Sequence, residues 1–185
     1  MTFNKHFLAV GLFFLSSSLF IACKTLAQDT QNWNLFTDTA GKFTAKYPPN
    51  WSNKIKEGNR VFFTSPPESD NDSFYENINI HVTQNAGYGT QIKINELFPA
   101  VTNQLKSGFK EFTSESQRSF KWNNIDDVEI IYSGYNKIDE SIKVRMTQWF
   151  CFYKTRLYTV TYTAAADNTV YTPTARKIMG SIVFK

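Results

Sequence analysis

The run IKVRMTQWFCFY at residues 142–153 constrains the fold more than any other part of the chain. Apolar and polar residues alternate at its start, which is the period of a strand with one buried face. Further along, Phe150 and Phe152 fall on one face. Trp149 and Cys151 fall on the other. A strand that is apolar on both faces is covered on both sides, so we expect an antiparallel sheet with helices on both faces.

The same period of two predicts the other strands. GKFTAKYPPNW contains a strand at 43–47, which ends at Pro48 and Pro49 because proline has no N–H to extend a ladder. Trp51 is expected to pack back over this strand. Further strands are predicted at residues 60–65, 76–84, 127–135, 157–164 and 181–184.

Two helices are predicted between these strands. Residues 95–108 carry apolar side chains at a spacing of four, including Val101 and Leu105, which is the stripe of a helix with one buried face. TPTARKIMG predicts a short second helix with Thr172 as its cap. The order of strands, helix, strands, helix and strand indicates an α+β fold, an α-β-α sandwich.

Residues 1–22 are typical of a signal peptide. Lys5 gives a basic start, and the apolar run at 7–21 has 15 residues, fewer than the roughly 20 of a membrane-spanning helix. LFIAC resembles a bacterial lipobox, which predicts cleavage before Cys23 and lipid attachment to it. Cleavage after Ala27 is the alternative, because Thr25 and Ala27 are small residues at the positions that a signal peptidase reads. Both sites stay open, and we favour the first.

Either cleavage predicts an exported bacterial protein. It would be a lipoprotein on the periplasmic face of a membrane, or a soluble periplasmic or secreted protein if cut after Ala27. Polar residues 23–32 are expected to form a flexible tether, followed by a single domain at 33–185. Cys151 then has no intrachain partner, so the fold must depend on its hydrophobic core.

The sequence offers little catalytic chemistry. It contains no nucleophile elbow, zinc-binding helix motif or phosphate-binding loop. His81 lies on the polar face of a predicted strand and is expected at the surface. Cys151 lies between two phenylalanines and is expected to be inert in the core. We therefore predict no enzyme and no catalytic residue. A hydrolase with two carboxylates across a cleft is the enzymatic alternative, since sequence cannot place such a pair.

An acidic loop is the candidate metal site. Its four carboxylates lie within nine residues, and hard cations such as calcium bind several oxygens. They are Glu68, Asp70, Asp72 and Glu76. The spacing is not that of an EF-hand, so a solvated loop is expected, with calcium as the candidate ion and no cofactor.

The basic residues are dispersed along the chain. The formal net charge is +4, with no cluster of lysines and arginines. Nucleic-acid binding would need such a cluster, so no nucleic-acid partner is expected.

The chain resembles the PsbP-like family at three places. GKFTAKYPPNW matches the N-terminal pattern of the family. The central helix and the strands that end in LYTVTYTA match the middle of the family pattern, and GSIVF matches its C-terminal element. This covers most of 33–185. The resemblance implies an α-β-α sandwich that binds or assembles and does not catalyse. We therefore expect a lipid-anchored domain that binds or stabilises another envelope or membrane component.

The same resemblance implies an alternative. Photosystem II members of the family support the oxygen-evolving centre and help to retain calcium and chloride. An extrinsic photosystem II subunit is therefore the second hypothesis, although no residue here matches an established ion ligand.

Overall fold

The computed structural model describes residues 30, 32–56, 58, 60–84 and 98–185. The predicted signal peptide, both cleavage sites, Cys23 and the start of the helix predicted at 95–108 lie outside these residues. No helix within the described ranges is both long and apolar enough to cross a membrane.

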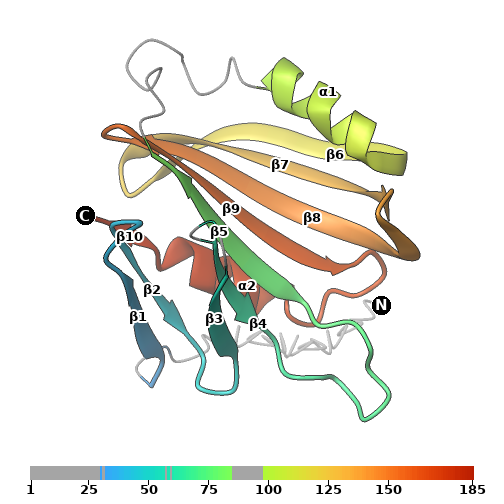
Figure 1. Ribbon diagram of the computed structural model, residues 1–185, viewed down its shortest axis with the longest axis horizontal. Helices are drawn as coiled ribbons and strands as arrows, with labels where there is room; N and C mark the ends of the chain where they lie inside the picture. Colours follow the sequence, from blue (N-terminus) through green and yellow to red (C-terminus); the bar gives the residue numbers. More distant parts are fainter. Residues whose placement is uncertain (1–29, 31, 57, 59, 85–97) are drawn as a thin grey trace, which may run out of the picture.

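In the described part of the chain, a seven-stranded antiparallel sheet forms the centre of the fold (Figure 1). Its strands, in spatial order, are β3 (Ser52–Lys56), β4 (Arg60–Thr64), β5 (Asn77–Thr83), β9 (Arg156–Ala165), β8 (Asp139–Tyr153), β7 (Ile125–Asn136) and β6 (Phe109–Trp122). Each pair of neighbours is antiparallel.

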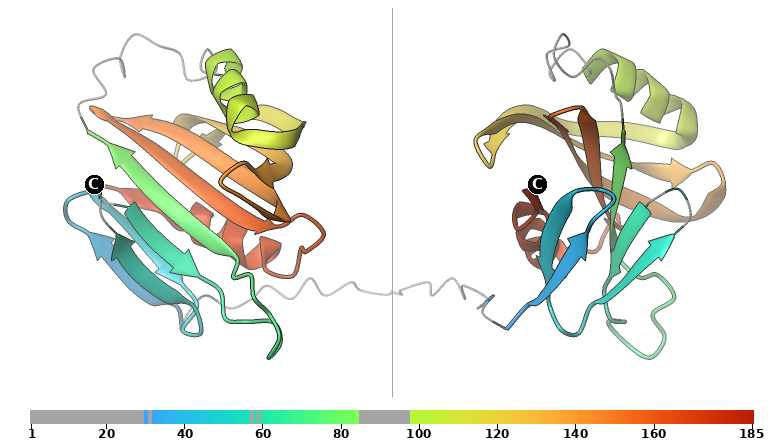
Figure 2. Two further views of the ribbon diagram at one scale, coloured as in Figure 1. Left: turned by 45° about the vertical axis from the view of Figure 1, so that its right-hand side comes forward. Right: turned by 60° about the vertical axis from the view of Figure 1, so that its left-hand side comes forward.

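A smaller sheet and two helices complete the described fold. The small sheet has the order β1 (Asn34–Asp38), β2 (Phe43–Tyr47) and β10 (Val183–Phe184). Helix α1 (Phe98–Gly108) lies over one face of the large sheet, above β6, β7 and β8. Helix α2 (Thr172–Gly180) lies on the opposite face, beside the small sheet (Figures 1 and 2). The predicted α+β fold, with helices on both faces of an antiparallel sheet, is therefore confirmed.

Strand β8 contributes to a hydrophobic core on each face. Trp149 and Cys151 belong to the larger core, together with Ile178 and Met179 of α2. Phe150, between them in sequence, belongs to the smaller core beneath α1. The alternation along this strand thus produces the two-sided burial that its sequence predicts.

The PPNW segment forms a corner. The Trp51 N–H donates to the carbonyl of Pro48 at 3.1 Å, which closes a turn after β2. Phe43 and Tyr47 face the larger core, as predicted. The Trp51 ring joins that core and meets Tyr171 edge to face at 5.7 Å, so the corner also fixes the approach to α2.

Three strands were not predicted: β1, β3 and β6. Every residue of β3 is exposed, and β6 has a single buried residue, Trp122. Both are edge strands of the large sheet, so few of their side chains are buried and the alternating pattern is weak. Register shifts in β6 between Lys110 and Ser116 disturb the pattern further.

The predicted cap of the second helix is wrong. Tyr171 is the N-cap, and it makes no side-chain capping hydrogen bond. Pro173 lies in the first turn, where its missing N–H is tolerated.

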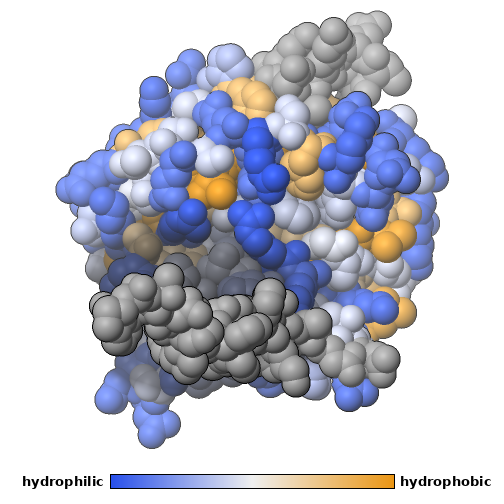
Figure 3. Space-filling view, turned by 180° about the vertical axis from the view of Figure 1, so that it is seen from behind, coloured by the Kyte–Doolittle hydropathy of each residue, from blue (hydrophilic) through white to orange (hydrophobic). Residues whose placement is uncertain are grey.

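Hydrophobic residues do not form a continuous surface on the described part of the face opposite to Figure 1. Hydrophilic residues separate several small apolar patches there (Figure 3). This distribution is ordinary for a folded domain, so this face does not by itself indicate a binding surface.

Candidate functional site

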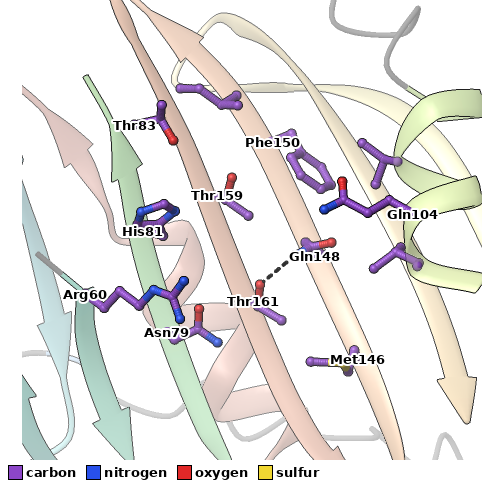
Figure 4. A pocket seen from close by; sticks show the side chains of 13 residues that line it. Arg60, Asn79, His81, Thr83, Gln104, Met146, Gln148, Phe150, Thr159 and Thr161 are labelled. Atoms are coloured by element: carbon purple, nitrogen blue, oxygen red, sulfur yellow. Dashed lines mark hydrogen bonds between the residues drawn. The ribbon is translucent and has the colours of Figure 1, made fainter. Parts of the chain in front are cut away.

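A cleft opens on the α1 face of the large sheet, between the helix and strands β4, β5 and β9 (Figure 4). Its volume is about 560 Å³. That size is within the range of small-molecule sites.

The register of the strands builds the polar half of the cleft. Arg60 of β4 pairs with His81 of β5, which pairs with Thr159 of β9. In a second row, Asn79 of β5 pairs with Thr161 of β9. Directly paired residues project from the same face of a sheet. Residues distant in sequence therefore line one polar surface.

The other half of the cleft is apolar. Val101 and Leu105 project from α1, and Met146, Phe150 and Leu157 come from β8 and β9. All five contribute to the core beneath α1. The cleft lies where this core ends, with apolar groups next to the helix and polar groups beyond it.

Arg60 is the only residue with a permanent charge among those that line the cleft in the described structure. His81 is half-buried beside it. Burial, followed by the charge of Arg60, lowers the pKa of His81 below its ordinary 6.5. The histidine is therefore neutral at pH 7, and the cleft carries one positive charge.

Gln148 joins the two halves of the cleft. Its Nε2 donates to Thr161 Oγ1 at 2.9 Å. Its Oε1 is buried and accepts no hydrogen bond from the described residues. A buried acceptor without a donor is unfavourable, so this oxygen is a local cost to the fold.

The described lining of the cleft offers an imidazole, hydroxyl groups, amide groups and one guanidinium group. The cleft lining contains no carboxylate and no thiol among the described residues. Cys151 is fully buried, and its side chain belongs to the core on the opposite face. Burial, with a further contribution from Asp127, raises the pKa of its thiol to about 12. The thiol is therefore inert at neutral pH, as predicted.

His81 is not a plain surface residue. Its sequence position suggested an exposed polar face, but α1 and the curved sheet make that face one side of a cleft. Arg60, Asn79, Thr159 and Thr161 were not singled out from sequence. The only signal was a row of polar residues on alternate strand positions, which is also typical of a solvent-facing strand.

The acidic loop uses its carboxylates for internal contacts. Asp72 accepts hydrogen bonds from the backbone N–H groups of Glu68 and Phe74, at 2.9 and 3.0 Å. The Asn168 amide donates to Glu68 at 2.6 Å and to Glu76 at 3.0 Å. Burial raises the pKa of Glu76.

These contacts connect the acidic loop to the segment before α2. Across the described ranges, no three His, Cys, Asp or Glu side chains form a group that could hold a metal ion. The structure therefore does not gather Glu68, Asp70, Asp72 and Glu76 into one site.

Two carboxylates do lie together, on the face opposite the cleft. Asp127 and Glu129 of β7 are both buried, and burial raises the pKa of Asp127 to about 8. Burial would also raise the pKa of Glu129. The hydrogen bonds from Arg118, Trp149 and Arg176 outweigh it and lower that pKa. Neither carboxylate lines the cleft, so they do not form the predicted alternative of a hydrolase pair across a cleft.

Comparison with known proteins identifies the fold. No protein-family model matches the chain, and no curated protein sequence matches it. Among solved structures, cyanobacterial PsbP (CyanoP) from Synechocystis sp. superposes with a TM-score of 0.53 at 13% identity, covering 83% of this chain and 92% of that one.

Two further structures share the arrangement. LpqN of Mycobacterium tuberculosis, involved in cell envelope biogenesis, has a TM-score of 0.58 at 12% identity over 77% of this chain and 83% of its own. The Ran-binding protein Mog1p of Saccharomyces cerevisiae has a TM-score of 0.56 at 8% identity, and the match covers 83% of this chain and 95% of Mog1p. The resemblance to PsbP is thus confirmed at the level of the fold, and the chain has the α+β fold shared by PsbP, LpqN and Mog1p.

Proposed function

We propose that this protein is an exported, non-catalytic domain that uses the cleft beside α1 to bind or stabilise another envelope component. The observation that carries the proposal is the composition of the cleft. It combines one cation, several hydrogen-bonding groups and an apolar wall, without a carboxylate or thiol in its described lining. Such a lining can recognise a partner but has little means of transforming it.

The similar structures support the same class of function. Mog1p is a Ran-binding protein, and LpqN takes part in envelope biogenesis. Binding is therefore an established use of this fold, and another protein with this fold is involved in biogenesis of a bacterial cell envelope. Because a fold does not fix a function, this support is secondary to the cleft.

Blocking the cleft tests the proposal. Thr159→Trp would fill the polar half of the cleft, whereas Asn103→Trp adds the same ring to an exposed position on α1 outside the lining. We expect an envelope component to co-purify with wild type and Asn103→Trp but not with Thr159→Trp. Equal recovery with both variants would contradict the proposal. Matching circular dichroism spectra would establish that both variants fold.

The anchor is a separate part of the proposal and rests on the sequence around Cys23. An acylated Cys23 would hold the domain at the periplasmic face of a membrane. Cys23→Ala is then expected to release the protein from the membrane fraction. A mature chain that begins at Gln28, found by mass spectrometry of the intact protein, would contradict lipid attachment and favour a soluble exported protein.

An extrinsic photosystem II subunit is the second candidate. The shared fold with cyanobacterial PsbP favours it. The same co-purification separates the two candidates, because recovery of photosystem II subunits through the cleft would support this one in place of a general envelope partner.

A further inference from the structure

The cleft is divided by polarity in a way that specifies a ligand class. Arg60 and His81 lie on the side of β4 and β5, away from the helix (Figure 4). Val101 and Leu105 of α1 lie on the other side, above Met146. A ligand that fills both sides must therefore have a polar end and an apolar end.

The polar end of such a ligand should be an anion. Arg60 makes no ion pair with a described residue, and the described cleft lining carries no acidic side chain. A guanidinium group matches a carboxylate or a phosphate through two parallel hydrogen bonds. A cationic head group would find only repulsion at this position.

The two sides of the cleft lie well apart. Gln148 lies between them, on β8, where its Nε2 donates to Thr161 Oγ1. From β4 to β8 is three strand spacings, roughly 14 Å. A ligand that reaches from Arg60 to the apolar wall must therefore be elongated, as a head group with an alkyl chain is.

We infer that the cleft binds a single-chain anionic amphiphile. Its carboxylate or phosphate pairs with Arg60, and its alkyl chain lies beneath α1 against Val101 and Leu105. This inference deepens the proposed function, since it names the ligand class of the same cleft.

Three related probes separate the parts of the ligand. N-dodecanoylglycine has a carboxylate, an amide N–H and an alkyl chain. Its methyl ester lacks the charge, and N-acetylglycine lacks the chain. Titration calorimetry below the micellar concentration would use the mature chain with Cys23→Ser, so that no attached lipid competes. Dodecyl phosphate in a parallel titration distinguishes a phosphate head from a carboxylate.

We expect saturable one-to-one binding of N-dodecanoylglycine, at least about tenfold weaker binding of the ester, and no measurable binding of N-acetylglycine. Arg60→Gln should weaken binding of the acid to the level of the ester. The matched control is Lys54→Gln, which removes the same charge from β3 outside the cleft and should leave the affinity unchanged.

Equal affinity for acid and ester, or equal effects of Arg60→Gln and Lys54→Gln, would overturn the inference. So would the absence of binding by both the carboxylate and the phosphate probe. Suppose that neither probe binds, but Thr159→Trp loses its envelope partner and Asn103→Trp keeps it. The ligand class is then wrong, and the proposed binding function stands. If Thr159→Trp keeps its partner, the proposed function is wrong as well.

Discussion

Helices α1 and α2 cover opposite faces of one sheet, but they contribute differently to the fold. Four of the nine residues of α2 are buried: Thr174, Ala175, Ile178 and Met179. Helix α1 has eleven residues in the described structure, and none of them is fully buried. Residues of α1 therefore remain available to line a cleft, while those of α2 are committed to the core.

The small sheet accounts for much of this difference. Strands β2 and β10 close the core around α2, where the Trp122 ring meets Trp149 and Phe184 at centroid distances of 5.1 and 4.9 Å. On the α1 face, no described strand or second helix covers β4, β5 and β9. The α2 face thus supplies most of the stability, and the α1 face leaves polar strand residues uncovered by any described helix or strand.

Equal truncations on the two helices should give unequal losses of stability. Ile178→Ala removes a fully buried side chain and should lower the free energy of unfolding by about 2–5 kcal/mol. Leu105→Ala removes a partly buried one and should cost only about 1 kcal/mol. Urea unfolding followed by tryptophan fluorescence measures both. Equal losses would show that α1 supports the fold as strongly as α2.

Buried charge on the α2 face should give the next largest effect. Glu129 is 1% exposed and accepts hydrogen bonds from Arg118 Nε, Trp149 Nε1 and Arg176 at 2.7, 2.7 and 2.8 Å. Glu129→Gln removes the charge that these donors share and should cost about 2–3 kcal/mol. The cost stays below that of a fully buried pair because the side chains of Arg118 and Arg176 are 53% and 36% exposed and can be hydrated.

The control for this prediction is the exposed pair of Lys121 and Asp126. Lys121→Gln should change the free energy of unfolding by less than about 1 kcal/mol. If Glu129→Gln lowers the free energy of unfolding no more than Lys121→Gln does, the buried network contributes little to stability.

Asp127 should make stability depend on pH. Because burial raises its pKa from 3.8 to about 8, the folded protein keeps a proton that the unfolded chain releases across this interval. The stability contributed by this group therefore falls as pH rises from about 4 to about 8. Asp127→Asn removes the titration and should gain about 1–3 kcal/mol relative to wild type between pH 5 and pH 8.

Urea unfolding at several pH values measures this difference. Asp126→Asn is the matched control, because Asp126 is the exposed neighbour in sequence. Parallel pH profiles for wild type and Asp127→Asn would contradict a raised pKa.

The smallest effect is expected in the cleft, at His81. Its lowered pKa means that folded His81 resists protonation, so stability falls slightly as pH drops through 6.5. NMR titration should place its midpoint below 6.5. Arg60→Gln should raise the midpoint only in part, because burial is the larger cause, and Lys54→Gln should not move it. A midpoint above 6.5 in wild type would mean that the cleft is more open to water than in the structure.

Much of the fold was predictable because burial leaves a local pattern. Residues 142–153 alternate and then become apolar on both faces, and this indicated a sheet covered on both sides. TPTARKIMG indicated the shorter helix through a different local signal, its proline at the start and glycine at the end, although its predicted cap was wrong. Strands β3 and β6 were missed because edge positions bury almost no side chains and leave no such pattern.

The cleft could not be predicted, for a physical reason. Each strand shows which of its residues are polar, but not whether its polar face meets water or a helix. Arg60 and Gln148 line one cleft only because of the register of strands β4, β5, β9 and β8. Helix α1 also ends short of the polar strands and leaves this cleft open. The local sequence thus determined the strands with a buried face, the helices and the inert Cys151, whereas long-range strand pairing decided which polar residues line the candidate site.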